Sequence, residues 1–311
     1  MSLRALKHGL EYAAFRLLVA VLRIVPEGLA VRGGALLGLF VATVPRIRRK
    51  DVDRHLAQAF PDRDRRWRAR VARRSYTHLG REAVVLFRMI RWSEDEIRAR
   101  TRTEGVDQVH RAVAEGEGVV VLTGHLGNWE VAGAALAARG IPLDVVGKGM
   151  ANRRFERDLF ELRERLGMHV IEMSEAPREV LRSLRDGRAT AVVADQNMHR
   201  NGIFLPFFER LAATARGPAL FALRAGAPVV FGYCLREPGW RQRYMIRVRP
   251  LVHEVTGDLE VDIRNLMLAY HAVLEDAVRA APEQYFWQHR RWKTRPPEEV
   301  DPRASEAASG A

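Results

Sequence analysis

A histidine and a glutamate stand five residues apart in the segment from Thr123 to Glu130, which reads Thr-Gly-His-Leu-Gly-Asn-Trp-Glu. His125 follows a β-rich apolar run at 118–123 and precedes a helical pattern at 128–139. It is therefore expected at the carboxyl end of a strand, where open α/β sheets bind ligands. From the first turn of the helix, the Glu130 carboxylate can hold one ring nitrogen of His125 and leave the other free as a base. The spacing indicates general-base chemistry, although a histidine near a glutamate is more often structural.

The segment carries no nucleophile of its own. There is no Gly-x-Ser-x-Gly elbow, and Cys234, the single cysteine, stands far away in an apolar run. The attacking group is therefore expected to come from a substrate, most simply as a hydroxyl that His125 deprotonates. One cysteine excludes a disulfide framework, a cysteine-rich zinc site and an iron–sulfur cluster. His199 and His289 have no second ligand at a metal-binding spacing, so no metal or other cofactor is predicted.

The elements that must position His125 alternate between strand and helix. After the first strand and helix, the apolar patterns predict strands at 143–147, 170–172, 189–194, 229–235 and 244–252 and helices at 153–166, 175–185 and 259–280. This alternation predicts an α/β fold whose central, mostly parallel or mixed sheet is flanked by helices. The polar tail at 296–311 is predicted to be disordered.

The composition is that of a water-soluble globular chain with an excess of positive charge. Apolar residues make up 47% of the 311 residues and charged residues 29%, which excludes a collagen, a wholly disordered chain and a polytopic membrane protein. The 51 basic residues outnumber the 38 acidic ones, and the net charge of +13 favours an anionic partner such as phosphate, nucleic acid or acidic lipid. Since only four of the basic residues are lysine, a coding bias towards arginine also explains part of the excess.

The first fifty residues are more apolar than the rest. Residues 12–25 are apolar apart from Arg16 and Arg23, and the uncharged stretch 33–45 is shorter than the roughly 20 residues that cross a bilayer. The basic cluster 46–50 follows at once, as in a cytoplasmic anchor beside anionic headgroups. Residues 1–50 are therefore predicted to be a membrane anchor or a pair of interfacial amphipathic helices. The alternative is two amphipathic helices that pack on the remainder of the chain.

The wording His-Leu-Gly-Asn-Trp-Glu resembles the His-x-x-x-x-Asp/Glu motif of the glycerolipid acyltransferase superfamily, and its flanks resemble the bacterial lipid A biosynthesis acyltransferases. Three further blocks agree in order. These are Ala194-Asp195-Gln196 after a strand, the run from Phe204 to Ala219, and the run from Pro282 to Pro296. The resemblance covers essentially the whole chain, including the apolar amino terminus.

This resemblance implies an O-acyltransferase that needs no metal. The fatty acyl group would move from an acyl carrier protein thioester to a hydroxyl of a lipid A precursor, at the cytoplasmic face of the inner membrane. Residues 51–295 would form the acyltransferase domain, and residues 1–50 would hold it to the anionic membrane surface as a single span or a monotopic anchor. His125 would take the hydroxyl proton while Glu130 fixes the imidazole.

Basic and polar side chains would then hold the sugar phosphates and the oxyanion. Arg163 is the first candidate, although Arg165 competes with it because side chains two residues apart on a helix face different ways. Asp195 is expected to bind substrate or to brace a neighbour. The remaining candidate substrate-binding residues are Lys148, Asn152, Gln196, Arg290 and Arg291.

Two alternative functions remain open from the sequence. One keeps the chemistry but changes the acceptor to a glycerophospholipid, a glycolipid or an aminolipid. The other is a non-catalytic basic protein that binds membranes or nucleic acid. Nucleic acid is not expected, because Trp287 and Trp292 beside Arg290, Arg291 and Lys293 are also typical of a membrane-interface anchor.

Overall fold

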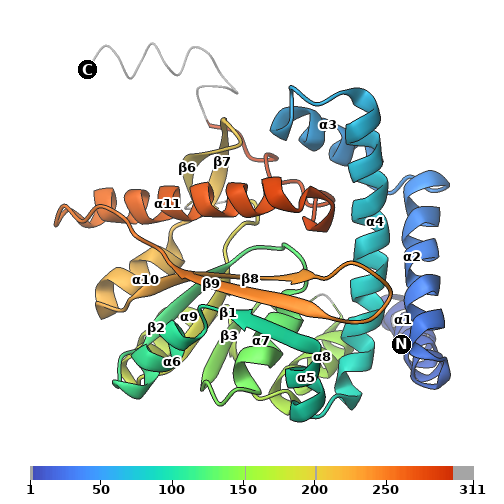
Figure 1. Cartoon of the computed structure of the whole chain (residues 1–311), viewed down its shortest axis with the longest axis horizontal. Helices are drawn as coiled ribbons and strands as arrows, with labels where there is room; N and C mark the ends of the chain where they lie inside the picture. The colour runs from blue at the N-terminus through green and yellow to red at the C-terminus, as the bar shows by residue number, and fades with distance from the viewer. Residues whose placement is uncertain (1–2, 151, 200–201, 297–311) are drawn as a thin grey trace.

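The protein is described by a computed structural model over residues 3–150, 152–199 and 202–296. Helices lie on both sides of a central sheet, and the N-terminal helices stand along one edge of it (Figure 1). The strands are β1 (Thr101–Glu104), β2 (Val119–Thr123), β3 (Leu143–Gly147), β4 (Met168–Glu172), β5 (Ala189–Val193), β6 (Gly202–Phe207), β7 (Arg210–Ala215), β8 (Val229–Arg236) and β9 (Tyr244–Pro250). The α-helices are α1 (Leu3–Ile24), α2 (Glu27–Thr43), α3 (Arg49–Ala59), α4 (Arg65–Arg88), α5 (Glu94–Arg100), α6 (Asp107–Ala114), α7 (Trp129–Ala137), α8 (Arg153–Arg165), α9 (Ala176–Arg185), α10 (Gly217–Ala225) and α11 (Leu259–Ala280).

The main sheet has seven strands in the order β1-β9-β8-β2-β5-β3-β4. Neighbouring strands are parallel except for β8 and β9, which pair antiparallel. The predicted α/β fold with a mixed sheet and flanking helices is therefore confirmed. The order also places β5 directly beside β2, although about 65 residues separate them in the chain.

The position of β2 in the middle of the sheet explains why residues 119–122 are all apolar. Val119 and Val121 pack into the core beneath α7, whereas Val120 and Leu122 pack into the core beneath α10 and α11. A strand that is covered on both faces has no solvent side, so apolar residues run continuously along it. His125 comes two residues after the end of this strand, so the strand fixes where the loop that carries His125 begins.

The N-terminal helices form a closely packed layer of their own. Gly34 and Gly38 on α2 face α4, where a Cβ at Gly34 would lie 2.4 Å from the carbonyl oxygen of Gly80, so only glycine permits this approach. The opposite side of α2 exposes Leu36, which is 67% exposed, and Phe40, which is 52% exposed. Helix α2 thus packs on the chain, as one alternative anticipates, and also leaves an apolar face outside.

No helix in the described ranges is both long enough and apolar enough to cross a membrane.

Several elements were not anticipated, namely β1, β6, β7, α3, α5, α6 and α10. Strands β6 and β7 form an antiparallel hairpin outside the main sheet, and α10 follows the hairpin. Apart from Pro296, the predicted disordered tail at 296–311 lies outside the described residues.

Candidate active site

The loop between β2 and α7 is held on two sides by backbone hydrogen bonds. Asn128 N donates to Cys234 O on β8 at 2.9 Å, and Gly127 N donates to Gln284 O at 2.9 Å. Gly127 has a φ of +68°, and a Cβ there would lie 1.7 Å from Cys234 O. This position therefore requires glycine, because a side chain would clash with β8 and strain the backbone. The result is a rigid turn that presents His125.

Both oxygens of the Asp195 carboxylate bind His125. The ring nitrogen Nδ1 of His125 lies 2.6 Å from Asp195 Oδ1, and the His125 backbone N–H donates to Oδ2 at 2.8 Å. The contact follows from the strand order, since Thr123 at the end of β2 pairs with Val193 at the end of β5. Asp195 is only 3% exposed, so it is a fixed partner of the ring.

The expectation that Glu130 holds the imidazole is therefore corrected. Glu130 faces α8, where Arg163 Nε donates to Oε2 at 3.0 Å and Arg163 Nη2 donates to Oε1 at 2.6 Å. Glu130 lies in the first turn of α7, on the side of that helix that packs towards α8. Arg165 is exposed, so Arg163 is the arginine of the pair that enters the site region.

The other ring nitrogen of His125, Nε2, lies beside the exposed side chain of Gln196. With its proton on Nδ1 directed to Asp195, the ring has a lone pair on Nε2, and Gln196 Nε2 lies 3.1 Å from it. Gln196 is exposed, whereas the His125 side chain is 14% exposed. Trp129 packs edge-on at a centroid distance of 4.5 Å, and Phe286 lies at 5.9 Å. The geometry is that of an oriented base which an entering hydroxyl reaches by displacing one amide.

The charge on Asp195 is maintained by its surroundings. Burial alone would raise the pKa of Asp195, but the charge and hydrogen bonds of His125 outweigh it and hold that pKa below its usual value. The charge of Arg291 contributes in the same direction. The carboxylate is thus ionised at neutral pH and can stabilise an imidazolium.

The expectation that Arg291 binds substrate is not supported by its position. The residue is 2% exposed, its Nη1 donates to Ala213 O at 2.6 Å, and its Nη2 donates to Thr214 Oγ1 at 2.7 Å. Burial lowers the pKa of Arg291, although nearby groups partly offset this. Arg291 therefore ties the C-terminal segment to β7 beneath the site.

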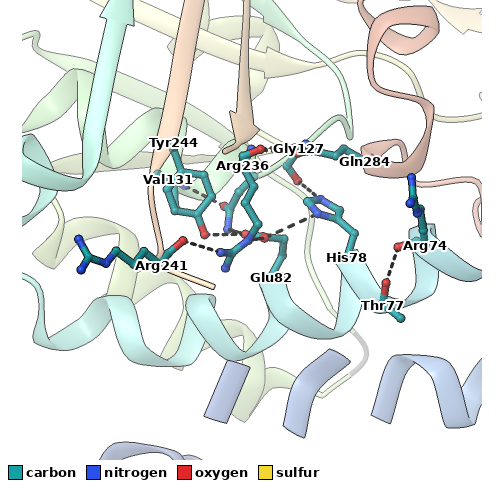
Figure 2. Close-up of polar contacts among 11 residues, drawn as sticks. Arg74, Thr77, His78, Glu82, Gly127, Val131, Arg236, Arg241, Tyr244 and Gln284 are labelled. Atoms are coloured by element: carbon teal, nitrogen blue, oxygen red, sulfur yellow. Dashed lines mark hydrogen bonds and ion pairs between the residues drawn. The ribbon is translucent and has the colours of Figure 1, made fainter. Parts of the chain in front are cut away.

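A buried ion-pair network that the sequence did not reveal supports the loop from the side of α4 (Figure 2). Glu82 accepts hydrogen bonds from Arg236 Nε at 2.6 Å, Asn128 Nδ2 at 2.7 Å and Tyr244 Oη at 2.9 Å. Asn128 in turn caps α7, because its Oδ1 accepts from Val131 N at 2.9 Å. The sequence signal that could have revealed it is Glu82 itself, which is the one acidic residue within α4.

Glu82→Ala is expected to destabilise the fold by about 3–5 kcal/mol, because it leaves the Arg236 guanidinium buried without its counter-charge. The matched control is Glu104→Ala, which removes an exposed pair with Arg247 and is expected to cost less than about 1 kcal/mol. Urea unfolding monitored by tryptophan fluorescence measures both. Equal losses in the two variants would contradict a structural role for the buried network.

The remaining candidates lie on or near the same rim. Lys148 follows β3 and is exposed, and Asn152 caps α8 through a hydrogen bond from Arg154 N at 3.2 Å. Arg290 is exposed and donates from Nε to Asp51 Oδ2 at 2.9 Å. The structure brings together His125, Asp195 and Gln196 by direct contact, whereas substrate binding by Lys148, Asn152 and Arg290 stays a prediction.

Two hollows adjoin the site. The first is a cavity of about 60 Å³ between α7 and the sheet, with an almost wholly apolar lining that is interrupted by the Glu130–Arg163 pair. The second, which we name the headgroup groove, has a volume of about 460 Å³ and is lined by Arg48, Tyr76, Asn197, Phe286, His289 and Arg290 among others. Trp129 links His125 to the cavity, and Phe286 links it to the groove.

Two histidines near the site are predicted to make stability depend on pH. Burial lowers the pKa of His271 to about 3 and that of His289 to about 4, from 6.5. The unfolded chain therefore binds more protons than the folded chain between these values, so the unfolding free energy should fall as the pH falls from 6.5 towards about 4. Urea unfolding across that pH range measures it. His271→Gln should flatten the profile, and an unchanged slope in this variant would contradict the assignment.

Comparisons with known proteins find a family model and two groups of relatives that resemble this chain. A family model described as "Bacterial lipid A biosynthesis acyltransferase" matches residues 1–294. The lipid A biosynthesis palmitoleoyltransferase of Escherichia coli is 26% identical over 271 residues, which are 86% of this chain and 85% of the relative. The lipid A biosynthesis lauroyltransferase of the same organism is 24% identical over 87% of each chain.

The names of a second group of relatives specify a different acceptor. The phosphatidylinositol mannoside acyltransferase of Mycolicibacterium smegmatis is 29% identical over 190 residues, which are 60% of this chain and 60% of the relative. The chain spans about half the length of the corresponding Mycobacterium tuberculosis protein, with 30% identity.

Proposed function

The chain belongs to the family of bacterial lipid A biosynthesis acyltransferases, and we propose that it transfers a fatty acyl group from an acyl carrier protein thioester to a hydroxyl of a lipid A precursor. The observation that carries the proposal is the contact of 2.6 Å between His125 Nδ1 and Asp195 Oδ1, which leaves Nε2 oriented as a base. This revises the dyad expected from the sequence, in which Glu130 had the role that we now give to Asp195.

The proposed reaction needs no covalent enzyme intermediate. His125 Nε2 takes the proton of the acceptor hydroxyl, and the oxygen attacks the thioester carbonyl carbon. As the tetrahedral intermediate collapses, the carbon–sulfur bond breaks and the imidazolium returns the proton to the leaving thiolate. Asp195 stabilises the imidazolium throughout, because its carboxylate is already held at Nδ1. Transfer therefore ends with an ester, a free thiol and a neutral histidine.

We assign to Arg163 the role of stabilising the negative charge that develops on the carbonyl oxygen. Its guanidinium is fixed by the bidentate pair with Glu130, and both residues line the apolar cavity beside Trp129. Glu130 then acts as a positioning residue for Arg163. The acyl chain is proposed to enter this cavity. Because the volume of the cavity is only about 60 Å³, a long acyl chain requires the lining side chains to move.

Membrane association is proposed on the exposed apolar side chains of α1 and α2. Ile24 is 85% exposed, Leu17 is 68% exposed, and Leu36 on α2 is 67% exposed. Contiguous apolar side chains on the outside of a protein mark an interaction surface, and the adjoining basic cluster 46–50 favours anionic lipid. We propose that this face lies in the cytoplasmic leaflet of the inner membrane.

The likeness to phosphatidylinositol mannoside acyltransferases favours a second acceptor class, a glycosylated phospholipid. To decide, purified protein is incubated with radiolabelled acyl carrier protein thioester and either a lipid A precursor or phosphatidylinositol mannoside, and the products are identified by mass. The proposal expects label in the lipid A precursor. Label only in phosphatidylinositol mannoside would show that the acceptor is a glycosylated phospholipid and not a lipid A precursor. Label in neither lipid would overturn the proposed function.

A further inference from the structure

A strongly basic pocket lies where α2, α3 and α4 meet the C-terminal segment. Its volume is about 690 Å³, and its charged lining consists of two carboxylates, Asp51 and Asp53, and seven basic side chains, Arg46, Arg48, Arg49, Lys50, Arg65, Arg73 and Arg290. We name these seven side chains and the space between them the basic pocket. Three segments that are separate in the sequence thus contribute positive charge to one hollow.

The two carboxylates are already neutralised. Arg49 Nε lies 2.9 Å from Asp53 Oδ1, and Arg290 Nε lies 2.9 Å from Asp51 Oδ2. The second pairing helps to hold the pKa of Asp51 below its usual value, against the effect of burial. Arg48 Nη1 lies 3.7 Å from Asp51 Oδ2. Within the described parts of the chain, the remaining four basic side chains make no ion pair and no side-chain hydrogen bond; these are Arg46, Lys50, Arg65 and Arg73.

Four unpaired cations around one hollow favour an anion of more than one charge. Their mutual repulsion is relieved only by solvent, salt or a bound anion. Arg46 and Arg48 also adopt left-handed backbone conformations, with φ of 51° and 59°, which are costly for residues that carry a Cβ. Such conformations occur where the surrounding structure imposes them, often at binding sites.

The pocket adjoins the proposed acceptor route. Arg48 and Arg290 line both the basic pocket and the headgroup groove, and the groove reaches Phe286, whose ring lies 5.9 Å from that of His125. Two exposed apolar side chains follow α2 close to Arg46 in the chain. These are Val44, which is 65% exposed, and Ile47, which is 56% exposed and also lines the groove. An anion in the basic pocket would therefore lie next to the groove that leads to Phe286 and His125 and near exposed apolar side chains.

We infer that the basic pocket binds a phosphomonoester carried by the acceptor lipid and thereby directs the acceptor hydroxyl along the headgroup groove to His125. A phosphomonoester has a charge of about −1.5 to −2 at neutral pH and three acceptor oxygens, which match several unpaired cations better than the single charge of a phosphodiester. The inference rests on the proposed function for the destination of the hydroxyl, but not for the binding of phosphate.

The kinetic test uses the full chain with Arg65→Gln and Arg73→Gln combined. The matched control combines Arg66→Gln and Arg70→Gln, which remove the same charge from exposed positions on the same helix that do not line the pocket. Transfer is measured to a phosphorylated acceptor and to its phosphatase-treated form. Phosphate removal should raise the wild-type KM by about tenfold or more with little change in kcat. The pocket variant should have, with both acceptors, the raised KM that the wild type shows with the phosphatase-treated acceptor. The control should behave as the wild type.

A binding test keeps this inference separate from the chemistry. Flotation with phosphatidylcholine vesicles that contain phosphatidic acid is compared with flotation on vesicles that contain phosphatidylserine at the same surface charge. Wild type and control should prefer phosphatidic acid, whereas the pocket variant should bind both vesicles equally. If the wild type transfers acyl groups to no lipid, the proposed function fails. This binding test alone then decides whether the basic pocket binds a phosphomonoester.

Three results would overturn the inference. Equal losses in the pocket variant and the control would show general electrostatic adhesion to the membrane. A raised KM for the acyl carrier protein thioester alone would show that the pocket docks the donor. No preference of the wild type for phosphatidic acid would show that the pocket does not recognise a phosphomonoester.

Discussion

Replacement of His125 by alanine is expected to lower kcat for acyl transfer by about 10²–10⁴-fold, because an oriented general base contributes a factor of this size. The His125 side chain is only 14% exposed but makes its strongest contact with one residue, Asp195, so the variant should remain folded. Transfer is measured from acyl carrier protein thioester to the lipid A precursor by mass spectrometry, with urea unfolding as the check on folding.

The control for this variant is His110→Ala, which removes an exposed histidine on α6. It should retain the wild-type kcat. A folded His125→Ala protein with more than about a tenth of wild-type kcat would contradict general-base catalysis by this ring, because that loss is smaller than an oriented base normally supplies.

Asp195→Asn is expected to lower kcat by about 10⁴-fold, as the same change does in a catalytic triad. The Asp195 carboxylate accepts a hydrogen bond from Nδ1–H of His125. An asparagine amide that donates to Nδ1 instead favours the tautomer with its proton on Nε2. The nitrogen that faces the acceptor hydroxyl would then be a donor and not a base. The loss should therefore appear in kcat, while KM for the acceptor changes little.

Asp144→Asn is the matched control for Asp195→Asn. Asp144 is also 3% exposed and paired with a basic side chain, Arg188, but it lies on β3 within the sheet. The control should lose stability and keep its kcat. If both variants lose kcat in proportion to their loss of stability, Asp195 has only a structural role.

The fold class and the position of His125 at the end of a strand were predicted from the sequence. Continuous apolar runs separated by helical patterns define β2, α7 and β5, and a histidine at the end of such a strand must lie at the sheet rim. Asp195 was anticipated as a residue that binds substrate or braces a neighbour, because it ends another of these strands.

The partner of His125 was assigned wrongly because sequence distance is a poor guide to contact in a sheet. Glu130 is five residues from His125 but begins a helix whose face turns to α8, whereas Asp195 is 70 residues away and becomes adjacent because β5 pairs with β2. Strand order arises from packing of the whole chain, which local patterns do not determine.

The buried Glu82 and the basic pocket were missed for a related reason. Glu82 lies in α4, whereas its three hydrogen-bond donors, Asn128, Arg236 and Tyr244, lie outside that helix. The basic cluster 46–50 was interpreted as part of a membrane anchor, and Arg65 and Arg73 stand further along the chain. Only the packing of α2, α3 and α4 brings them around one hollow.

The most direct test of the central claim is the tautomer of the His125 ring, read from its 15N chemical shifts in protein with labelled histidine and assigned by comparison with His125→Gln. The account predicts that neutral His125 carries its proton on Nδ1 and leaves Nε2 unprotonated, and that Asp195→Asn reverses this whereas Glu130→Gln does not. A proton on Nε2 in the wild type, or a tautomer that responds to Glu130→Gln and not to Asp195→Asn, would contradict it.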